Sequence, residues 1–336
     1  MAGQRKPVIA LTMGDPAGIG PELIVKVLAE GEPYARCRPF VIGHPRVMAE
    51  ICDVVGAPLT LRPIDDLAEA HFRPGEVDVL RPRELALGEV AWGALRPTMG
   101  QAAALCLKEA FSLAMAGSVV GVVSAPLNKE AFHLAGYDYL DDLAYLADLT
   151  GSKHTYMMGV MRDAIWTVSI TEHIAFRAIA DAVTRERVLW YIREMDRVLR
   201  RVGLDVPRIA VAALNVHGGE GGLFGREEID ELRPAIENAC GRGVDVHGPV
   251  PADTVFVRAL GGEFDGVVCM YHDQANIARK LQPMETRATL YMGLPVPCGT
   301  TTHGTAFDKA GQGVANPGSL RAALRHTVAL AGAAGI

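Results

Sequence analysis

VIALTMGDPAGIGPE, Val8–Glu22, joins an apolar run to a glycine-rich turn and then to a helix-like stretch. The apolar run predicts a buried strand, and glycines at 14, 18 and 20 let the backbone turn sharply. Pro21 suits the first turn of the following helix, where free N–H groups could receive an anion. The spacing differs from the G-x-G-x-x-G of a Rossmann fingerprint, and no acidic residue follows at the required distance. A tight turn and a ligand-binding loop therefore both account for this segment.

The same alternation continues along the 336 residues and predicts the fold class. Strand-like apolar runs alternate with helix-period stretches, which indicates βαβ units and a largely parallel sheet. Several runs are apolar throughout, as in strands that are covered on both faces. The predicted strands are Val8–Met13, Pro39–Ile42, Ser118–Ser124, Trp166–Ile170, Arg208–Leu214, Gly266–Met270 and Ala288–Tyr291. The predicted helices are Pro21–Leu28, Arg46–Val54, Met99–Met115, Arg185–Val202, Glu227–Ala239 and Ser319–Ala331.

Composition excludes several classes of protein. Apolar residues are 49% and charged residues 21% of the chain, as in soluble globular proteins. The net charge of −6 and the 6% aromatic content argue against nucleic-acid binding. No apolar run approaches the roughly 20 residues of a membrane helix. Six scattered cysteines without a C-x-x-C pair, and an N-terminus without a cleavage site, predict a reducing, cytoplasmic location.

Three histidines each follow an apolar strand: His173, His217 and His272. The carboxyl ends of parallel strands face one crevice, where ligands bind. We therefore expect these imidazoles to bind one divalent metal, with coordination positions left open for substrate. For any single histidine, a structural or hydrogen-bonding role is the alternative.

Two glycine-rich segments and two acids could complete such a site. Asn215–Gly225 surrounds His217 and is either a surface turn or a loop that a ligand approaches. Thr302–Ser319 contains His-Gly-Thr-Ala and Asp308, and it suits backbone contact with a nucleotide, although Asp308 could instead cap a turn. Asp253 and Asp273 could hold a cation or move a proton, or could be solvated or cap helices.

The segments GDPAGIGPE, SAPLNKE, NVHGGEGG, PADT, MYHDQ, GLP and HGTAFDKAG occur in the order seen in the 4-hydroxythreonine-4-phosphate dehydrogenase family. The resemblance covers nearly the whole chain. The HGTA segment and the opening loop also resemble isocitrate and isopropylmalate dehydrogenases. This implies a two-domain α/β fold with mostly parallel sheets flanked by helices and a cleft between the domains. The implied division is 1–125 plus 295–336 on the cofactor side, and 126–294 with the metal histidines and the dimer contact.

The resemblance also implies roles for single residues. His173, His217 and His272 match the family's divalent-metal ligands, zinc being favoured, in a site that two copies of the chain share as a homodimer. Lys280 matches a substrate-contacting lysine and Asp253 an active-site aspartate; Asp273 is a further candidate base. The expected contacts to NAD or NADP are Gly14, Gly18, His303, Gly304, Thr305, Ala306 and Asp308.

Four positions depart from the family pattern. Asp142 and Leu143 stand where the family has a histidine and a threonine, and Thr289 and Cys298 stand where it has an asparagine and an arginine. A phosphate needs donors and positive charge, and an aspartate repels it. We therefore expect a substrate pocket that differs from the family norm.

The expected reaction is the oxidation, in a small hydroxy acid, of a secondary alcohol β to the carboxylate, followed by decarboxylation of the β-keto acid that forms. The first alternative is a true 4-hydroxythreonine-4-phosphate dehydrogenase in pyridoxal phosphate synthesis, and the second is a dehydrogenase for a carboxylated cis-dihydrodiol. Two further alternatives belong to other functional classes: the chain could be an acyl transferase of similar fold or a binding module without catalytic activity. Arg162, Arg279 and Arg287 could contact a substrate carboxylate.

Overall fold

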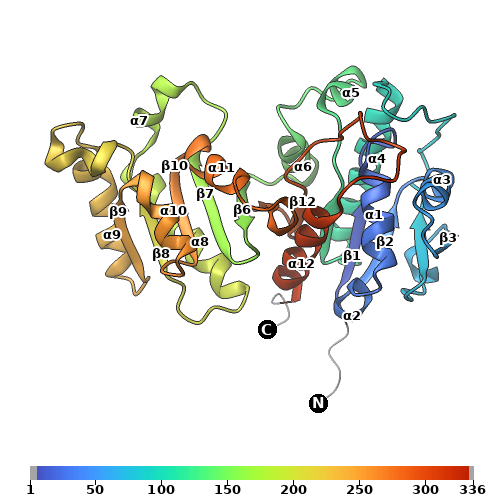
Figure 1. Ribbon diagram of the computed structural model, residues 1–336, viewed down its shortest axis with the longest axis horizontal. Helices are drawn as coiled ribbons and strands as arrows, with labels where there is room; N and C mark the ends of the chain where they lie inside the picture. Colours follow the sequence, from blue (N-terminus) through green and yellow to red (C-terminus); the bar gives the residue numbers. More distant parts are fainter. Residues whose placement is uncertain (1–5, 333–336) are drawn as a thin grey trace, which may run out of the picture. The chain divides into compact units, whose positions relative to one another are not determined.

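The computed structural model describes residues 6–332, and its contacts divide the chain into two compact units. The first unit runs to Tyr156 and resumes at Ala288, and the second is Met157–Arg287 (Figure 1). Residues 126–156 and 288–294, which the family resemblance places in the second domain, lie here in the first unit. In the first of these stretches, α5 (Lys129–Leu134) and α6 (Asp142–Thr150) pack against α4 (Pro97–Met115) of that unit.

The first unit has a mostly parallel sheet with the strand order β3-β4-β2-β1-β5-β12-β11. Only β11 runs antiparallel, to β12, among these described strands. The strands are β1 (Val8–Thr12), β2 (Arg38–Ile42), β3 (Thr60–Ile64), β4 (Glu76–Leu80), β5 (Gly121–Ser124), β11 (Ala288–Met292) and β12 (Cys298–Thr300). The helices are α1 (Gly20–Ala29), α2 (Pro33–Arg36), α3 (Pro45–Val55), η1 (Leu67–Glu69), α4 (Pro97–Met115), α5, α6 and α12 (Gly318–Gly332).

The second unit has the strand order β6-β7-β10-β8-β9, and β6 alone among them runs antiparallel, to β7. Its strands are β6 (Tyr156–Met161), β7 (Ile165–Thr171), β8 (Ile209–Ala212), β9 (Val246–Val250) and β10 (Gly266–Tyr271). Its helices are η2 (Phe176–Ala178), α7 (Ile179–Ala182), α8 (Arg185–Arg201), η3 (Val216–Gly222), η4 (Glu228–Leu232), α9 (Arg233–Cys240), α10 (Ala252–Leu260), α11 (His272–Lys280) and η5 (Met284–Thr286). The predicted α/β class with mostly parallel strands is confirmed in both units.

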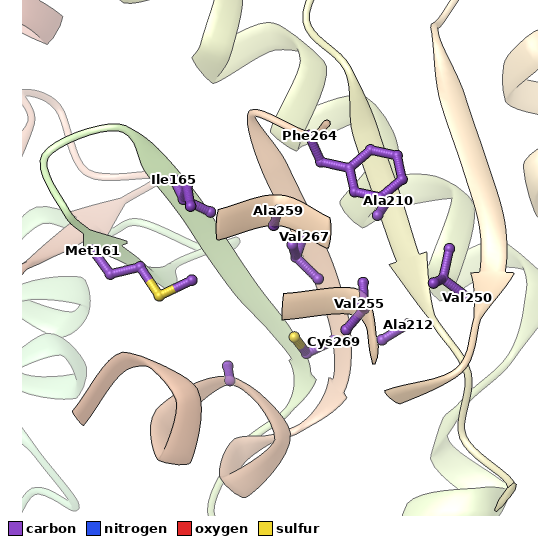
Figure 2. Packing of buried hydrophobic residues seen from close by; sticks show 11 residues of the cluster. Met161, Ile165, Ala210, Ala212, Val250, Val255, Ala259, Phe264, Val267 and Cys269 are labelled. Atoms are coloured by element: carbon purple, nitrogen blue, oxygen red, sulfur yellow. The ribbon is translucent and has the colours of Figure 1, made fainter. Parts of the chain in front are cut away.

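The core of the second unit lies between its strands and α10. Figure 2 shows Val255 and Ala259 of α10 over Val267 and Cys269 of β10, with side chains of β8 and β9 beside them. On the other face, Gly266 of β10 has no room for a side chain because α8 packs directly against it. Both faces of β10 are therefore covered, which explains its unbroken apolar sequence.

Two predicted elements have different bounds. The strand predicted over Arg208–Leu214 ends at Ala212, because the N–H groups of Leu214 and Asn215 donate to the Glu228 carboxylate and not to a strand. The helix predicted over Glu227–Ala239 is divided into a π-helical turn, η4, and α9, which begins at Arg233. Pro234 lacks the N–H that an uninterrupted α-helix would need at that point.

Several elements escaped the sequence prediction. They include β3, β4, β6, β9, β12, α6, α10 and α11, the last of which has a largely polar sequence. Within residues 6–332, no helix is long and apolar enough to cross a bilayer. All six cysteines are among the described residues, and each is a free thiol.

Candidate functional site

Two of the predicted metal ligands meet at the carboxyl ends of neighbouring strands. β7 and β10 are parallel partners, with Thr171 opposite Tyr271. His173 lies two residues beyond β7, and His272 begins α11 directly after β10. The two imidazole rings have their centroids 5.9 Å apart. Strand pairing therefore brings together two side chains that are 99 residues apart in the sequence.

A third donor, Glu172, belongs to this cluster, and the sequence interpretation missed it. One ligand atom each from Glu172, His173 and His272 lie within 4.8 Å of one another. Imidazole nitrogens and a carboxylate oxygen are typical ligands of divalent transition metals. The signal in the sequence was the acid immediately before His173, which matters only once β7 and β10 are known to be neighbours. The donor set fits a divalent cation.

Charges and hydrogen bonds around the cluster shape its electrostatics. Burial raises the pKa of the Glu172 carboxyl, whereas the nearby His272 and a hydrogen bond with Ser169 oppose the rise. The positive charge of the half-buried Arg279 also lowers the pKa of Glu172. Asp273 Oδ1 lies 2.8 Å from His272 Nδ1, so this carboxylate can orient the ring.

The cluster opens into a cavity of about 220 Å³. Its walls are Thr171, Glu172, His173, Ile174, Phe176, Ile179, Tyr271, His272 and Asp273. The rings of Phe176 and Tyr271 meet edge to face at 5.8 Å and form an aromatic wall. Pockets that bury a drug-sized ligand usually exceed about 300 Å³. This cavity therefore suits an ion and the reacting end of a small substrate.

His217 lies elsewhere in this chain. Among the described residues, the donor group contains Glu172, His173 and His272 and does not contain His217. The His217 ring is exposed, with Nδ1 3.1 Å from Glu220 Oε1. The physical reason is that β8 ends at Ala212, so His217 is five residues beyond its strand. His173 and His272 are only two residues and one residue beyond theirs.

The predicted catalytic residues are exposed in the second unit. Asp273 lines the cavity and contacts His272. Lys280 ends α11, and eight residues at 1.5 Å each put its Cα about 12 Å along the helix from His272. Asp253 lies in the first turn of α10, the helix that packs against the η3 turn carrying His217. Of the three, Asp273 is the residue that lines this cavity.

The four departing positions lie in the first unit, and three of them are buried. Leu143, Thr289 and Cys298 are 6%, 9% and 0% exposed. Tyr291, opposite Cys298 in the β11–β12 pair, donates its hydroxyl to Asp142 Oδ2 at 2.7 Å. Burial raises the pKa values of both Asp142 and Tyr291. The sequence interpretation missed Tyr291, since its partner lies 149 residues away.

The glycine-rich loop packs against the HGTA segment in the first unit. Ile19 N donates to Thr305 O at 3.0 Å, and a Cβ on Gly18 would lie 2.9 Å from Thr305 Cβ. Gly14 has φ +70°, and a Cβ there would lie 2.4 Å from Pro126 O. Close packing within the protein therefore accounts for these two glycines.

The remaining expected dinucleotide contacts follow Thr302. His303 and Ala306 are half-buried, whereas Gly304 and Asp308 are exposed. Thr305 is buried, and it is the residue whose carbonyl holds the glycine-rich loop. A Cβ on Gly304 would meet no atom within 4 Å, so the backbone is open to approach at this residue.

The sequence matches the family described as pyridoxal phosphate biosynthetic protein PdxA over residues 35–327. D-threonate 4-phosphate dehydrogenase of Pectobacterium atrosepticum is 42% identical over 325 residues, covering 96% of this chain and 99% of that protein. A 4-hydroxythreonine-4-phosphate dehydrogenase of Desulfosudis oleivorans is 39% identical and covers 95% and 94% of the two chains. The crystal structure of a 4-hydroxythreonine-4-phosphate dehydrogenase from Klebsiella pneumoniae has a TM-score of 0.82 and 40% identity, covering 97% of this chain and 100% of that one.

A more distant structure confirms the predicted fold class. A β-decarboxylating dehydrogenase from Thermococcus kodakarensis has a TM-score of 0.51 and 16% identity, over 94% of this chain and 80% of that one, and so shares the fold alone. The family match and the 39–42% identity extend over most of the chain. The chain therefore belongs to the PdxA family, and it is an oxidoreductase that acts on a hydroxyl group.

Proposed function

We propose that this chain is a metal-dependent dehydrogenase, linked to NAD or NADP, that oxidises a secondary alcohol β to a carboxylate and decarboxylates the product. The observation that carries the proposal is the donor set of Glu172, His173 and His272 within 4.8 Å. The substrates named for similar family members are consistent with it, because the C3 hydroxyl of a threonate is β to its carboxylate.

The donor set indicates which residues would hold the metal. Glu172, His173 and His272 offer one oxygen and two nitrogens, a set that suits zinc and other borderline divalent ions. When bound, the cation supplies Lewis-acid polarisation of the substrate hydroxyl, and the dinucleotide supplies a hydride acceptor.

The chain's own residues would handle the protons and the charge. The hydroxyl proton passes to a carboxylate, that of Asp273 or Asp253, as hydride leaves the same carbon with its electron pair and a C=O bond forms. In the β-keto acid, the C–C bond to the carboxylate then breaks, and its electrons move onto the ketone oxygen. Lys280 is the proposed group for stabilising that oxygen or returning a proton to carbon.

The dinucleotide would approach the first unit at the HGTA segment. We assign its contacts to His303, Gly304, Thr305, Ala306 and Asp308, the open backbone at Gly304 supporting this assignment. The loop containing Gly14 and Gly18 contacts this segment at Thr305, whose carbonyl accepts from Ile19 N.

The substrate pocket is proposed to differ from the family norm. Asp142 presents a carboxyl group that Tyr291 already engages, and Cys298 adds no positive charge. This chemistry disfavours a phosphate at that position. An unphosphorylated hydroxy acid, such as a carboxylated cis-dihydrodiol, is therefore the favoured substrate class. The alternative is a phosphorylated hydroxy acid such as D-threonate 4-phosphate or 4-hydroxythreonine 4-phosphate, which the similar relatives favour.

A terephthalate 1,2-cis-dihydrodiol dehydrogenase from Burkholderia xenovorans supports the favoured class. Its structure has a TM-score of 0.63 and 28% identity, over 93% of this chain and 94% of that one.

We further propose a homodimer whose site is shared, with His217 of one copy completing the cluster of the other. Exposed apolar side chains occur near both parts: Phe176, which lines the cavity of the cluster, is 77% exposed, and Leu223, in the loop that carries His217, is 74% exposed. Apolar side chains so placed are typical of a surface that another chain covers.

Metal binding gives the first test. Calorimetric titration of metal-free protein with Zn²⁺ should show His173→Ala and His272→Ala weakening binding by at least about tenfold. The matched control is His247→Ala, because His247 is also exposed and paired with a neighbouring aspartate, Asp245, in the second unit. Full turnover by rigorously metal-free protein would contradict the proposal.

Substrate choice gives the second test. NAD(P)H formation at 340 nm would be compared for D-threonate 4-phosphate, 4-hydroxythreonine 4-phosphate and a carboxylated cis-dihydrodiol. Greater activity on the dihydrodiol is the expected result. Greater activity on either phosphate would overturn the pocket argument and leave the metal proposal intact.

A further inference from the structure

A buried carboxylate holds the base of the loop that carries His217. Glu228 is 1% exposed and begins η4. Its Oε1 accepts from Leu214 N at 2.9 Å and from Asn215 N at 2.7 Å. Its Oε2 accepts from Asn215 Nδ2 at 2.9 Å. All three donors lie between the end of β8 and His217, so this one side chain closes the stem of the loop.

The same stem is tied to the helix that begins at His272. Gln274 of α11 donates from Nε2 to Ala213 O at 2.7 Å, and its Oε1 accepts from Met270 N at 2.8 Å. Ala213 immediately precedes the two residues that Glu228 binds. The stem is therefore fixed both to the β10–α11 junction and to η4.

Beyond the stem, the loop adopts a conformation that local sequence does not favour. The five residues from His217 to Gly221 all have positive φ, although His217 and Glu220 are not glycines. Such strain persists where the surrounding structure imposes it. Close packing contributes, because a Cβ on Gly219 would lie 2.8 Å from Glu228 Oε2.

We propose that Glu228 is a positioning residue, which sets the place of His217 without touching metal or substrate. The inference rests on the proposed role of His217 as a metal ligand. Without the carboxylate, the N–H groups of Leu214 and Asn215 lose their acceptor, and the strained turn loses the contact that determines its conformation. Residues that orient a ligand in this way usually change metal affinity about 10- to 100-fold when replaced.

Co²⁺ titration of the full-length protein, followed by visible absorption, tests the inference. Glu228→Gln keeps one oxygen as acceptor for the two main-chain N–H groups. Its NH₂ group, however, replaces the oxygen that accepts from Asn215 Nδ2, so two donors face each other. We expect it to weaken Co²⁺ binding about tenfold, and Glu228→Ala to weaken it further. The matched control is Asp230→Asn in the same turn, because Asp230 is exposed and paired only with exposed Arg226 in the hydrogen bonds of the described structure. This control should bind Co²⁺ as the unaltered protein does.

His217→Ala, measured alongside, separates the two possible failures. If His217→Ala weakens Co²⁺ binding and Glu228→Gln does not, the positioning role is wrong and the shared site stands. If His217→Ala leaves Co²⁺ binding unchanged, the assignment of His217 as a ligand is wrong. A lower melting temperature of Glu228→Gln with unchanged Co²⁺ affinity would assign a purely structural role and overturn the inference. Should Glu228→Ala fail to fold, Glu228→Gln decides.

Discussion

His173 and His217 share a backbone property that their side-chain chemistry does not require. Their φ angles are 31° and 51°, in the left-handed region that residues other than glycine seldom occupy. Ala306, in the expected dinucleotide segment, has φ 42°. Such strain is concentrated at functional sites, where the surrounding structure over-determines the backbone. Phe72, Arg162 and Asp163, outside the candidate site, also have positive φ, so the three angles support the site only together with the donor geometry.

Asp15, in the glycine-rich loop, provides a pH-dependent prediction. The residue is fully buried, its Oδ1 accepts from Ala17 N, and burial raises its pKa from 3.8 to about 6. The native state thus holds the proton more tightly than the unfolded state, and the stability from the protonated form is lost as the pH rises through about 6. This group should lower the free energy of unfolding by about 1.4 kcal/mol between pH 5 and pH 8.

Urea unfolding at the two pH values measures this effect. Asp15→Asn does not titrate and keeps an acceptor for Ala17 N, so its stability should depend less on pH by that amount. The same pH dependence in both proteins would show that Asp15 is not responsible.

Gly159, in β6, leaves space for the half-buried guanidinium of Arg279. A Cβ at this residue would lie 1.5 Å from Arg279 Nη1. Gly159→Ala should therefore displace the guanidinium and lower the free energy of unfolding by about 1–3 kcal/mol. Denaturant unfolding measures the loss. Arg279→Met removes the clashing guanidinium. The double variant should therefore lose less unfolding free energy than the two single variants lose when their losses are added. Simple additivity would rule out this contact as the cause.

At the scale of elements, strand adjacency explains which histidines meet. β7 and β10 are direct partners, so residues one or two positions beyond them are close together. β8 lies on the opposite side of β10 from β7. It ends at Ala212, and the N–H groups of Leu214 and Asn215 beyond it donate to the Glu228 carboxylate. The loop that follows carries His217 away from the pair.

The start of α6 provides a prediction about an element. Asp141 is its N-cap and accepts from Ala144 N at 2.8 Å, and the next residue, Asp142, holds the Tyr291 hydroxyl. Asp141→Ala should lower the free energy of unfolding by about 1 kcal/mol, whereas Asp141→Asn, which keeps a capping oxygen, should cost less. Urea unfolding of both variants measures the difference. Equal losses would mean that charge, not capping, is what Asp141 contributes.

At the scale of the whole molecule, a shared site predicts complementation between inactive variants. His217→Ala and His173→Ala should each be inactive alone. In a two-fold dimer with shared sites, a mixed dimer has one intact site, so exchange of equal amounts should restore about a quarter of full activity. Light scattering of each variant checks that the dimer persists. Absence of any recovery in a demonstrated mixed dimer would place all ligands of a site on one chain.

The sequence predicted much of the fold because its signals were local. The apolar runs Trp166–Ile170 and Gly266–Met270 proved to be strands; the first is one residue longer at each end than predicted, and the second is one residue longer at its carboxyl end. Polar α11 and the Pro63-containing edge strand β3 gave no such signal. His173 and His272 were placed at strand ends from these runs, whereas Glu172 and Tyr291 matter only through partners far away in the sequence.

Hydrophobic periodicity, glycine and proline act over a few residues, so the chain's local pattern specified the α/β class and the strands that precede its histidines. The order of strands in the sheet determines which strand ends become neighbours. The path of the loop beyond β8 depends on contacts such as those of Glu228 with the stem of the His217 loop. Those contacts join distant segments. For this reason, only the folded chain decided that Glu172, His173 and His272 gather in one place and that His217 of the same chain does not join them.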